Sequence, residues 1–449
     1  MIKKNDTIKT KILNYGCNGE GVAKIDNQIV FLPYTLKDEQ ITATIINDKR
    51  KFLIGKPVDI LNKNKARIEA PCPYFTKCGG CQLQHAQYKH TLEVKQNIVQ
   101  DAITNIGKLD FKVSPCIPSN LTYNYRNKFA MPINPKTKKL GMYRTNSHSI
   151  VDIEHCLLQK EKINKLITVF NQYLQTTENS IYDDQTKKGV LKHLVAREID
   201  KQLLITVVIN ADNLPDKQQL INLLKQNFDN FGLSININKL NNNVILTNEF
   251  KQIYGLEKIE IYENDLCYSI NNQSFLQVND HIKTAIYNEV YNQIQNEVVI
   301  DAYSGAGLLS AMLSKHAKKV YGIEIIEQAT KSADLLKQKN NIQNLTNING
   351  DCSKQLPLLL DNLSNEDKKS LTIVLDPPRK GCDQKVLQSI LQVNPQKIIY
   401  ISCNPSTLAR DLNILLQDNK YSLQTIQPYD MFPQTKHVET LVILKSNKK

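Results

Sequence analysis

The stretch VVIDAYSGAGLLS, residues 298–310, decides the fold of the C-terminal part of the chain. An apolar run ends in a turn that contains two glycines, and a segment of helical composition follows the turn. Gly305 and Gly307 carry no Cβ, so the backbone of this turn can approach a bound molecule closely. A strand, a glycine-rich turn and a helix predict the first unit of an open α/β sheet, which binds ligands at the carboxyl ends of its strands.

The residues around this unit continue the same alternation of strands and helices. A helix is expected over residues 281–296, and four further apolar runs are separated by segments of helical composition. These runs are KVYGIEI (319–325), TIVLDPP (372–378), IIYISC (398–403) and ETLVIL (439–444). The alternation predicts a mostly parallel, doubly wound α/β sheet with an antiparallel end, a Rossmann-like domain that we place at residues 276–449.

The rest of the chain is organised differently. Residues 1–62 read as short strands divided by turn signals, which predicts a small β-barrel of the oligonucleotide-binding kind. Residues 63–275 are mostly strand-like, with helical periodicity near 88–107 and near 215–228. We therefore expect a central α+β domain between the barrel and the Rossmann-like domain.

The charge of the chain favours a polyanionic partner. The formal net charge is +13, and residues 121–150 hold six Lys and Arg residues, no Asp or Glu, and several interleaved aromatic residues. Cations neutralise phosphates and aromatic faces stack on bases, so this composition suits RNA, although a solvated basic loop would look the same. Arg126 and Lys128 are the candidate RNA-binding residues, with Arg126 the residue we expect nearest the target nucleotide.

Hydropathy argues against a membrane location. The hydrophobic share is 41%, and no stretch approaches the length of uncharged apolar residues that a membrane helix needs. The start, MIKKNDTIKT, lacks the apolar block of a signal peptide. We expect a cytoplasmic protein with no membrane partner.

The acids that follow the strands indicate the ligand of the Rossmann-like domain. Glu324 ends the second strand, about 20 residues after the glycine turn, where an acid can accept both hydroxyls of a ribose. The turn has no third glycine for a pyrophosphate, which favours a nucleoside ligand such as S-adenosylmethionine over a dinucleotide. Asp351 should end the third strand, near the adenine, and Asp376 ends the fourth in DPPRKG.

Cys403 lies where the next strand meets its loop, in KIIYISCNPSTLARDL (397–412). A small buried residue at a strand end would explain it, but so would a nucleophile. C5 of uracil is a poor nucleophile, and a thiolate that adds at C6 makes C5 able to attack a methylsulfonium. A base must then remove the C5 proton, and Glu439, at the mouth of the last strand, is a candidate, although an ordinary surface strand residue could stand there.

Four motifs together resemble the S-adenosylmethionine-dependent RNA uracil-5-methyltransferases, and most of all the bacterial 23S ribosomal RNA enzymes of the RlmD type. The motifs are SFLQVN (274–279), DPPRKG (376–381), SCNPSTLARDL (402–412) and DMFPQTKHVE (430–439). The resemblance covers nearly the whole chain and implies that residues 1–62 form a TRAM domain.

The resemblance also implies roles for individual residues. Cys403 would be the nucleophile that forms a covalent adduct at C6, and Glu439 would be the base. Cofactor contacts are implied for Gln277, Tyr303, Glu324, Asp351 and Asp376. Gly305 lies in the same turn, and Leu308 stands where relatives can carry a polar residue, so only a main-chain contact is expected there.

Four of the ten cysteines form a set of their own: Cys72, Cys78, Cys81 and, farther along the chain, Cys156. In a cytosolic chain such cysteines favour metal binding over disulfides. Four thiolates suit a zinc ion or a [4Fe–4S] cluster, and their spacing leaves both open. The resemblance implies the [4Fe–4S] cluster. The spacing is not the Cx3Cx2C of a radical enzyme, so we expect a structural or RNA-ordering cluster.

Several other functions compete with 23S ribosomal RNA methylation. A transfer-RNA uracil-5-methyltransferase shares the catalytic motifs, but the bacterial enzyme generally lacks the barrel and the cluster cysteines. A dual-site ribosomal enzyme has the same motifs, whereas an inactive RNA-binding iron–sulfur protein would need neither Cys403 nor Glu439. In DNA cytosine methyltransferases a Pro-Cys nucleophile loop precedes a Glu-Asn-Val motif, and this chain contains no Glu-Asn-Val. We expect a monomer that methylates C5 of a uridine in 23S ribosomal RNA.

Overall fold

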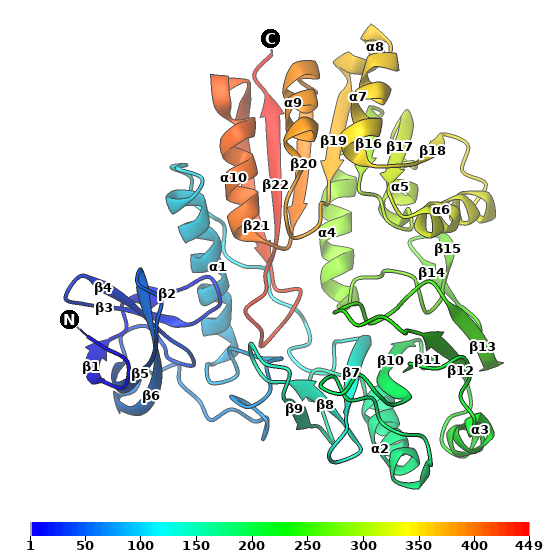
Figure 1. Ribbon diagram of the computed structural model, residues 1–449. Helices are drawn as coiled ribbons and strands as arrows, with labels where there is room; N and C mark the ends of the chain where they lie inside the picture. Colours follow the sequence, from blue (N-terminus) through cyan, green and yellow to red (C-terminus); the bar gives the residue numbers. More distant parts are fainter. Residues whose placement is uncertain (1, 449) are drawn as a thin grey trace. The chain divides into compact units, whose positions relative to one another are not determined.

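The computed structural model describes residues 2–448 of the chain (Figure 1). The chain divides into two compact units. The first unit comprises residues 1–75, 81–120 and 281–449, and the second comprises residues 76–80 and 121–280. The domain boundaries predicted at residues 62 and 275 remain a proposal. None of the helices within residues 2–448 combines the length and the hydropathy that a membrane crossing requires.

The N-terminal part of the first unit is a six-stranded sheet in the order β1-β5-β6-β4-β3-β2. In β5 buried and exposed residues alternate, because successive side chains of a strand point to opposite faces. The side chains on the buried face of this sheet, among them Val30, Leu32 and Ile41, form a hydrophobic core of their own. The strands are β1 (Thr7–Lys11), β2 (Asn14–Tyr15), β3 (Gly21–Ile25), β4 (Gln28–Leu32), β5 (Gln40–Asp48) and β6 (Phe52–Asn62).

A seven-stranded sheet forms the C-terminal part of the first unit, in the order β18-β17-β16-β19-β20-β22-β21. The first five of these strands are parallel to one another. β22 runs antiparallel to β20, and β21 runs antiparallel to β22, which confirms the predicted doubly wound sheet with its antiparallel end. The strands are β16 (Val298–Ala302), β17 (Lys319–Glu324), β18 (Leu345–Asn349), β19 (Leu371–Leu375), β20 (Lys397–Ser402), β21 (Tyr421–Tyr429) and β22 (Glu439–Ser446).

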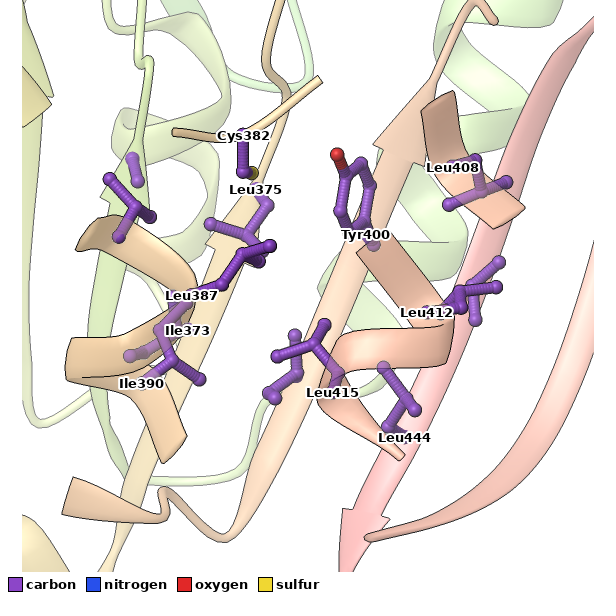
Figure 2. Packing of buried hydrophobic residues seen from close by; sticks show 14 of the residues in the cluster. Ile373, Leu375, Cys382, Leu387, Ile390, Tyr400, Leu408, Leu412, Leu415 and Leu444 are labelled. Atoms are coloured by element: carbon purple, nitrogen blue, oxygen red, sulfur yellow. The ribbon is translucent and has the colours of Figure 1, made fainter. Parts of the chain in front are cut away.

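Helices cover this sheet, and those expected over 88–107 and 281–296 are present as α1 and α4. Figure 2 shows how apolar side chains of α9 and α10 pack on β19 and β20 around Leu375 and Tyr400. Buried residues of α1 and α7 belong to the same core. The helices are α1 (Tyr88–Asn105), α4 (Asp280–Asn292), α5 (Leu308–Leu313), α6 (Glu327–Lys339), α7 (Cys352–Asn362), α8 (Asn365–Lys369), α9 (Gln384–Val393) and α10 (Pro405–Leu415).

The second unit is built on a seven-stranded sheet in the order β13-β12-β11-β10-β7-β8-β9, with a separate hairpin, β14–β15. Its helices are α2 (Glu161–Thr176) and α3 (Lys217–Lys225), of which only α3 was predicted. The strands are β7 (Lys128–Asn134), β8 (Lys139–Tyr143), β9 (Ile150–Asp152), β10 (Leu191–Ile199), β11 (Gln202–Ile209), β12 (Phe231–Ile237), β13 (Phe250–Gly255), β14 (Ile259–Glu263) and β15 (Leu266–Ile270).

Candidate active site

The strand register brings the loops that carry the predicted site residues to one edge of the C-terminal sheet. Ala302 pairs with Ile323 and with Leu375, so the carboxyl ends of β16, β17 and β19 lie level. β22 runs antiparallel to β20, and Ser402 pairs with Thr440. Cys403, the residue after β20, and Glu439, the first residue of β22, therefore lie at this same edge.

The turn after β16 is shaped by three residues with positive φ. Tyr303 has a φ of 68°, which is uncommon for a residue with a side chain and accompanies a sharp turn. Gly307, with a φ of 79°, precedes α5, and a Cβ there would lie 2.6 Å from the Cβ of Ala333. A Cβ on Gly305 would meet nothing within 4 Å. The backbone at Gly305 thus borders open space, where a ligand can approach it.

Glu324, at the end of β17, is fixed between this turn and the start of α6. Its Oε2 accepts a hydrogen bond of 2.9 Å from the N–H of Gly305, and its Oε1 accepts one of 2.8 Å from the N–H of Ile326. Each carboxylate oxygen has a second lone pair. The arrangement leaves both oxygens able to accept a further hydrogen bond from a pair of ligand hydroxyls.

Asp351 is the N-cap of α7, two residues past the end of β18. Its Oδ1 accepts a hydrogen bond of 2.8 Å from the N–H of Ser353, and this bond lowers the pKa of the Asp351 carboxyl. Leu308 begins α5 with a buried side chain, so any ligand contact there has to come from its main chain.

Two carboxyl groups near the edge have raised pKa values. Burial raises the pKa of Asp301, inside β16, to about 7, and the charge of Glu324 adds to the effect. The Oγ of Ser310 donates a hydrogen bond of 2.5 Å to Asp301. Burial and the charge of Asp301 raise the pKa of Asp376 to about 7. Asp301 was not predicted from the sequence as a site residue, although an acid inside the apolar run VVIDA could have indicated it.

The thiol of Cys403 is half-buried and surrounded by charged groups. Burial raises its pKa to about 11, the charges of Glu439 and Asp376 raise it, and the charge of Arg379 lowers it. The same charges act on Glu439, whose side chain is only 3% exposed. Burial, followed by the charge of Asp376, raises the pKa of Glu439 well above its usual value, and Arg379 opposes this shift.

A raised pKa makes a carboxylate a stronger base, and a general base works best when its pKa lies near the working pH. Cys403, Glu439 and Arg379 therefore form one electrostatically coupled set, drawn from the loop after β20, the start of β22 and the loop after β19.

Two side chains tie the loop of Arg379 to the loop of Cys403. Asn404 Nδ2 and Thr407 Oγ1 donate hydrogen bonds of 2.9 and 3.2 Å to the carbonyl oxygen of Arg379. Asn404 is also the N-cap of α10, where its Oδ1 accepts a hydrogen bond of 3.1 Å from the N–H of Ser406. Asn404 thereby connects DPPRKG with SCNPST, a role that the sequence analysis missed.

Three predicted site residues, Gln277, Arg126 and Lys128, lie in the second unit. The carbonyl oxygen of Gln277 accepts a hydrogen bond of 3.1 Å from Asn127 Nδ2. Arg126 Nε donates a hydrogen bond of 3.1 Å to the carbonyl oxygen of Lys128. Their roles toward cofactor and RNA remain predictions.

The four clustered cysteines are divided between the units, with Cys72 and Cys81 in the first and Cys78 and Cys156 in the second. All four are half-buried. The N–H of Gly80 donates a hydrogen bond of 3.3 Å to the Sγ of Cys78. Over residues 2–448, no group of three or more His, Cys, Asp or Glu side chains is arranged to hold a metal ion. The iron–sulfur cluster remains a prediction.

Comparison with known proteins assigns the family. The profile of the family described as tRNA (Uracil-5-)-methyltransferase matches residues 87–447, and the TRAM domain profile matches residues 3–58. The chain belongs to the RNA (uracil-5-)methyltransferase family. This confirms the resemblance, the dependence on S-adenosylmethionine, the Rossmann-like methyltransferase domain and the N-terminal TRAM domain.

RNA methyltransferases from bacteria match nearly the whole chain. An uncharacterized RNA methyltransferase of Clostridium tetani is 37% identical over 99% of this chain and 97% of its own. One from Clostridium acetobutylicum is also 37% identical, over 99% of this chain and 98% of its own. The crystal structure of Pyrococcus abyssi tRNA (uracil-54, C5)-methyltransferase with S-adenosyl-L-homocysteine matches with a TM-score of 0.79 and 23% identity. It covers 97% of this chain and 100% of that one, which shows a shared fold.

Proposed function

We propose that this methyltransferase modifies C5 of a specific uridine in 23S ribosomal RNA, through a covalent bond between Cys403 Sγ and C6 of the uracil. Glu439 acts as the base that removes the C5 proton. The observation that supports the proposal most is the meeting of Cys403, Glu439 and Arg379 at the ligand-binding edge of the sheet.

The thiol of Cys403 has to lose its proton before it can attack. Its pKa of about 11 keeps it protonated at neutral pH, so a positive charge nearby is required for reactivity. Arg379 supplies one such charge. The bound cofactor supplies an electrophilic methyl group on a positively charged sulfur, and this second positive charge favours the thiolate.

The two residues then act in sequence on the uracil. Attack of the Cys403 thiolate forms the Sγ–C6 bond, and the electrons of the C5–C6 double bond make C5 nucleophilic. C5 then bonds to the methyl carbon, and the bond from that carbon to the donor sulfur breaks, which leaves S-adenosylhomocysteine. After C5 is methylated it still carries a hydrogen. Glu439 takes this proton, the double bond forms again, and the Sγ–C6 bond breaks to release Cys403.

Residues at the edge of the sheet fit S-adenosylmethionine as the methyl donor. Glu324 has both carboxylate oxygens aimed by backbone N–H groups, which suits the two ribose hydroxyls. Gly305 borders open space beside it, and the charged Asp351 is the candidate for the adenine. We also assign cofactor contacts to Gln277, Tyr303, the main chain of Leu308, and Asp376.

Cys72, Cys78, Cys81 and Cys156 are the proposed ligands of a [4Fe–4S] cluster. Their chemistry fits, because four thiolates are the usual donors of such a cluster. The N–H of Gly80 that points at the Cys78 sulfur supports this, since hydrogen bonds of this kind stabilise a sulfur that carries negative charge. The cluster would order the surrounding segments and takes no part in methyl transfer.

Transfer RNA is the second candidate substrate. The family profile is described by a transfer-RNA activity, and the P. abyssi enzyme that shares the fold acts on uracil 54 of tRNA. The presence of the cluster cysteines, by resemblance, favours ribosomal RNA.

Incubation of the purified protein with radiolabelled S-adenosylmethionine and unmodified transcripts distinguishes the two substrates. We expect label in 23S ribosomal RNA, at C5 of one or two uridines. Label in transfer RNA alone would replace the proposed substrate. RNA binding without label in either transcript would assign a non-catalytic function.

A further inference from the structure

Two cationic side chains face each other on the sheet of the second unit. Arg197 on β10 pairs with Lys128 on β7 in an antiparallel ladder. Directly opposed residues of such a ladder project from the same face of the sheet, with Cβ atoms about 5 Å apart. Arg126 lies beside this pair, because its Nε donates a hydrogen bond of 3.1 Å to the carbonyl oxygen of Lys128.

Arg197 is buried and has an unsatisfied donor. Its side chain is 3% exposed, and its Nη2 donates a hydrogen bond of 2.8 Å to the carbonyl oxygen of Ser274. Its Nη1 is buried and has no hydrogen-bond partner in the part of the chain that the structure describes. A buried donor without an acceptor destabilises the fold, and more so when the group is charged.

The charge of Asp280 acts on this group of cations, and the same carboxylate pairs with Lys160. Asp280 is the carboxylate whose charge favours the Arg197 cation. Its Oδ1 accepts a hydrogen bond of 3.1 Å from Asn127 Nδ2, and its Oδ2 lies 3.3 Å from Lys160 Nζ. Lys160 therefore adds a further cation beside the carboxylate. Burial, aided by the charges of Arg197 and Arg126, lowers the pKa of Lys128 to about 8.

The neighbouring acid on β10 lies on the other face of the sheet. Glu198 directs its Oε2 to the start of α2, where it accepts a hydrogen bond of 3.2 Å from the N–H of Ile163. Like charges placed directly opposite each other destabilise a sheet, and local violations of this kind cluster at functional sites. An anion would satisfy the Nη1 donor and offset the repulsion at the same time.

We propose that Arg197, Lys128 and Arg126 form a binding site for a phosphodiester group of the substrate RNA. The site rests on the proposed function, which requires an RNA substrate. Guanidinium groups present planar pairs of N–H donors that match phosphate oxygens. Phosphate of the RNA backbone fits better than a free anion because Arg126 and Lys128 begin the basic stretch 121–150, which contains no acid and can follow a chain of phosphates.

RNA affinity at several salt concentrations tests the site, with the unmodified 23S transcript as the probe and no cofactor present. Arg197→Gln and Lys128→Gln should each weaken binding about tenfold and reduce the slope of log affinity against log salt by about 1. Lys217→Gln, which removes an exposed cation of α3, is the matched control and should change neither quantity.

Thermal unfolding without RNA separates this role from a structural one. Removal of one of two opposed cations should leave the unfolding temperature of Arg197→Gln unchanged or higher. An Arg197→Gln protein that unfolds earlier but binds RNA with the affinity and slope of the wild type would overturn the site. If Arg197→Gln fails to fold, Arg197→Lys takes its place. Arg197→Lys should keep the wild-type salt slope, whereas Lys128→Gln should reduce the slope by about 1. Equal slopes in the two variants would contradict the proposal.

Inorganic phosphate distinguishes the two sources of the anion. Stabilisation of the wild type by phosphate, together with unchanged RNA affinity in Arg197→Gln, would assign a small anion and overturn the RNA site. A wild-type protein that fails to bind RNA would contradict the proposed function itself. Wild-type binding that matches the binding of both variants would contradict this inference alone.

Discussion

The reactive residues depend on charges contributed by separate loops. Arg379 lowers the pKa of Cys403, whereas Glu439 and Asp376 raise it. The proposed nucleophile Cys403 and the proposed base Glu439 were identifiable from the sequence because they stand in recognisable motifs at strand ends. Asp301 was missed although its place inside an apolar run could have indicated it, and the burial effect that raises its pKa to about 7 depends on packing around β16.

Alkylation of Cys403 by iodoacetamide should report these charges. The rate should rise with pH toward a midpoint near 11 in the protein without cofactor. Glu439→Gln should lower the midpoint, because the negative charge of Glu439 raises the pKa of the Cys403 thiol. Arg379→Met should raise the midpoint, and the modified peptide can be followed by mass spectrometry. Midpoints that are identical in all three proteins would contradict the coupling.

Asp301 should make the stability of the protein without cofactor fall as the pH rises. Its pKa is about 7 when folded against the usual 3.8, so the native state holds more protons than the unfolded state between these values. The stability contributed by the protonated carboxyl is present below pH 4 and is lost as the pH rises through 7.

Urea unfolding at pH 5 and at pH 7.5 measures how much unfolding free energy is lost as the pH rises. This loss should be smaller in Asp301→Asn than in the wild type. Asp351→Asn is the control. Hydrogen bonds to Ser353 outweigh the effect of burial and lower the pKa of Asp351, so its titration lies below this pH range. A loss in Asp301→Asn equal to that of the wild type would rule out Asp301 as its source.

At the scale of elements, α1 anchors the segment that leads into β22 and Glu439. Lys95 on α1 and Asp430 form an ion pair in which both side chains are fully buried. Lys95 Nζ also donates a hydrogen bond of 2.9 Å to the carbonyl oxygen of Phe432, and Tyr88 donates one of 2.8 Å from its hydroxyl to Asp430 Oδ2. The start of DMFPQTKHVE is thereby held in a defined position.

Lys95→Met should destabilise the protein by about 3–5 kcal/mol, because the Asp430 carboxylate is left buried without its partner. The exposed pair Lys11–Asp38, with side chains 53% and 60% exposed, provides the control, and Lys11→Met should change stability little. Urea denaturation measures both. Equal effects of the two substitutions would contradict a structural role for the buried pair.

The elements that the sequence predicted were those with local periodicity. The strands and helices between residues 298 and 444 alternate clearly, whereas β21 is a half-exposed edge strand with polar residues and Pro428, and it gave no signal. The apolar residues of α2, such as Ile163, Leu166 and Phe170, do have helical spacing and could have been recognised. The position of β22 between β20 and β21 depends on pairing between distant segments, which local patterns do not reveal.

For the molecule as a whole, the strongest sequence signals concern its partners: a net charge of +13, a TRAM domain and a basic stretch in the second unit. These signals predict RNA but not which RNA, because proteins recognise a particular RNA largely by its folded shape and by its single-stranded bases. The opposed cations of the proposed phosphate site were equally hidden, since Lys128 and Arg197 are far apart in sequence.

Purified without oxygen, the whole protein should be brown and should contain about four iron and four sulfide per chain, because the four cysteine thiolates are proposed to hold a [4Fe–4S] cluster. Cys81→Ser should lower the iron content and the unfolding temperature together, since metal binding contributes to folding. Cys17→Ser, at an exposed cysteine outside the set, is the control. One zinc per chain and no iron would contradict the cluster.

The central claim is that Cys403 bonds to the target uracil and that Glu439 is needed for release. A denaturing gel with labelled substrate RNA measures this bond directly. Wild-type protein should be trapped by RNA with 5-fluorouridine at the target, because fluorine cannot be removed as a proton, and Glu439→Gln should accumulate a methylated protein–RNA species on ordinary RNA. Cys403→Ala should bind RNA but form no covalent species and transfer no methyl group. Methylation by Cys403→Ala would contradict the account.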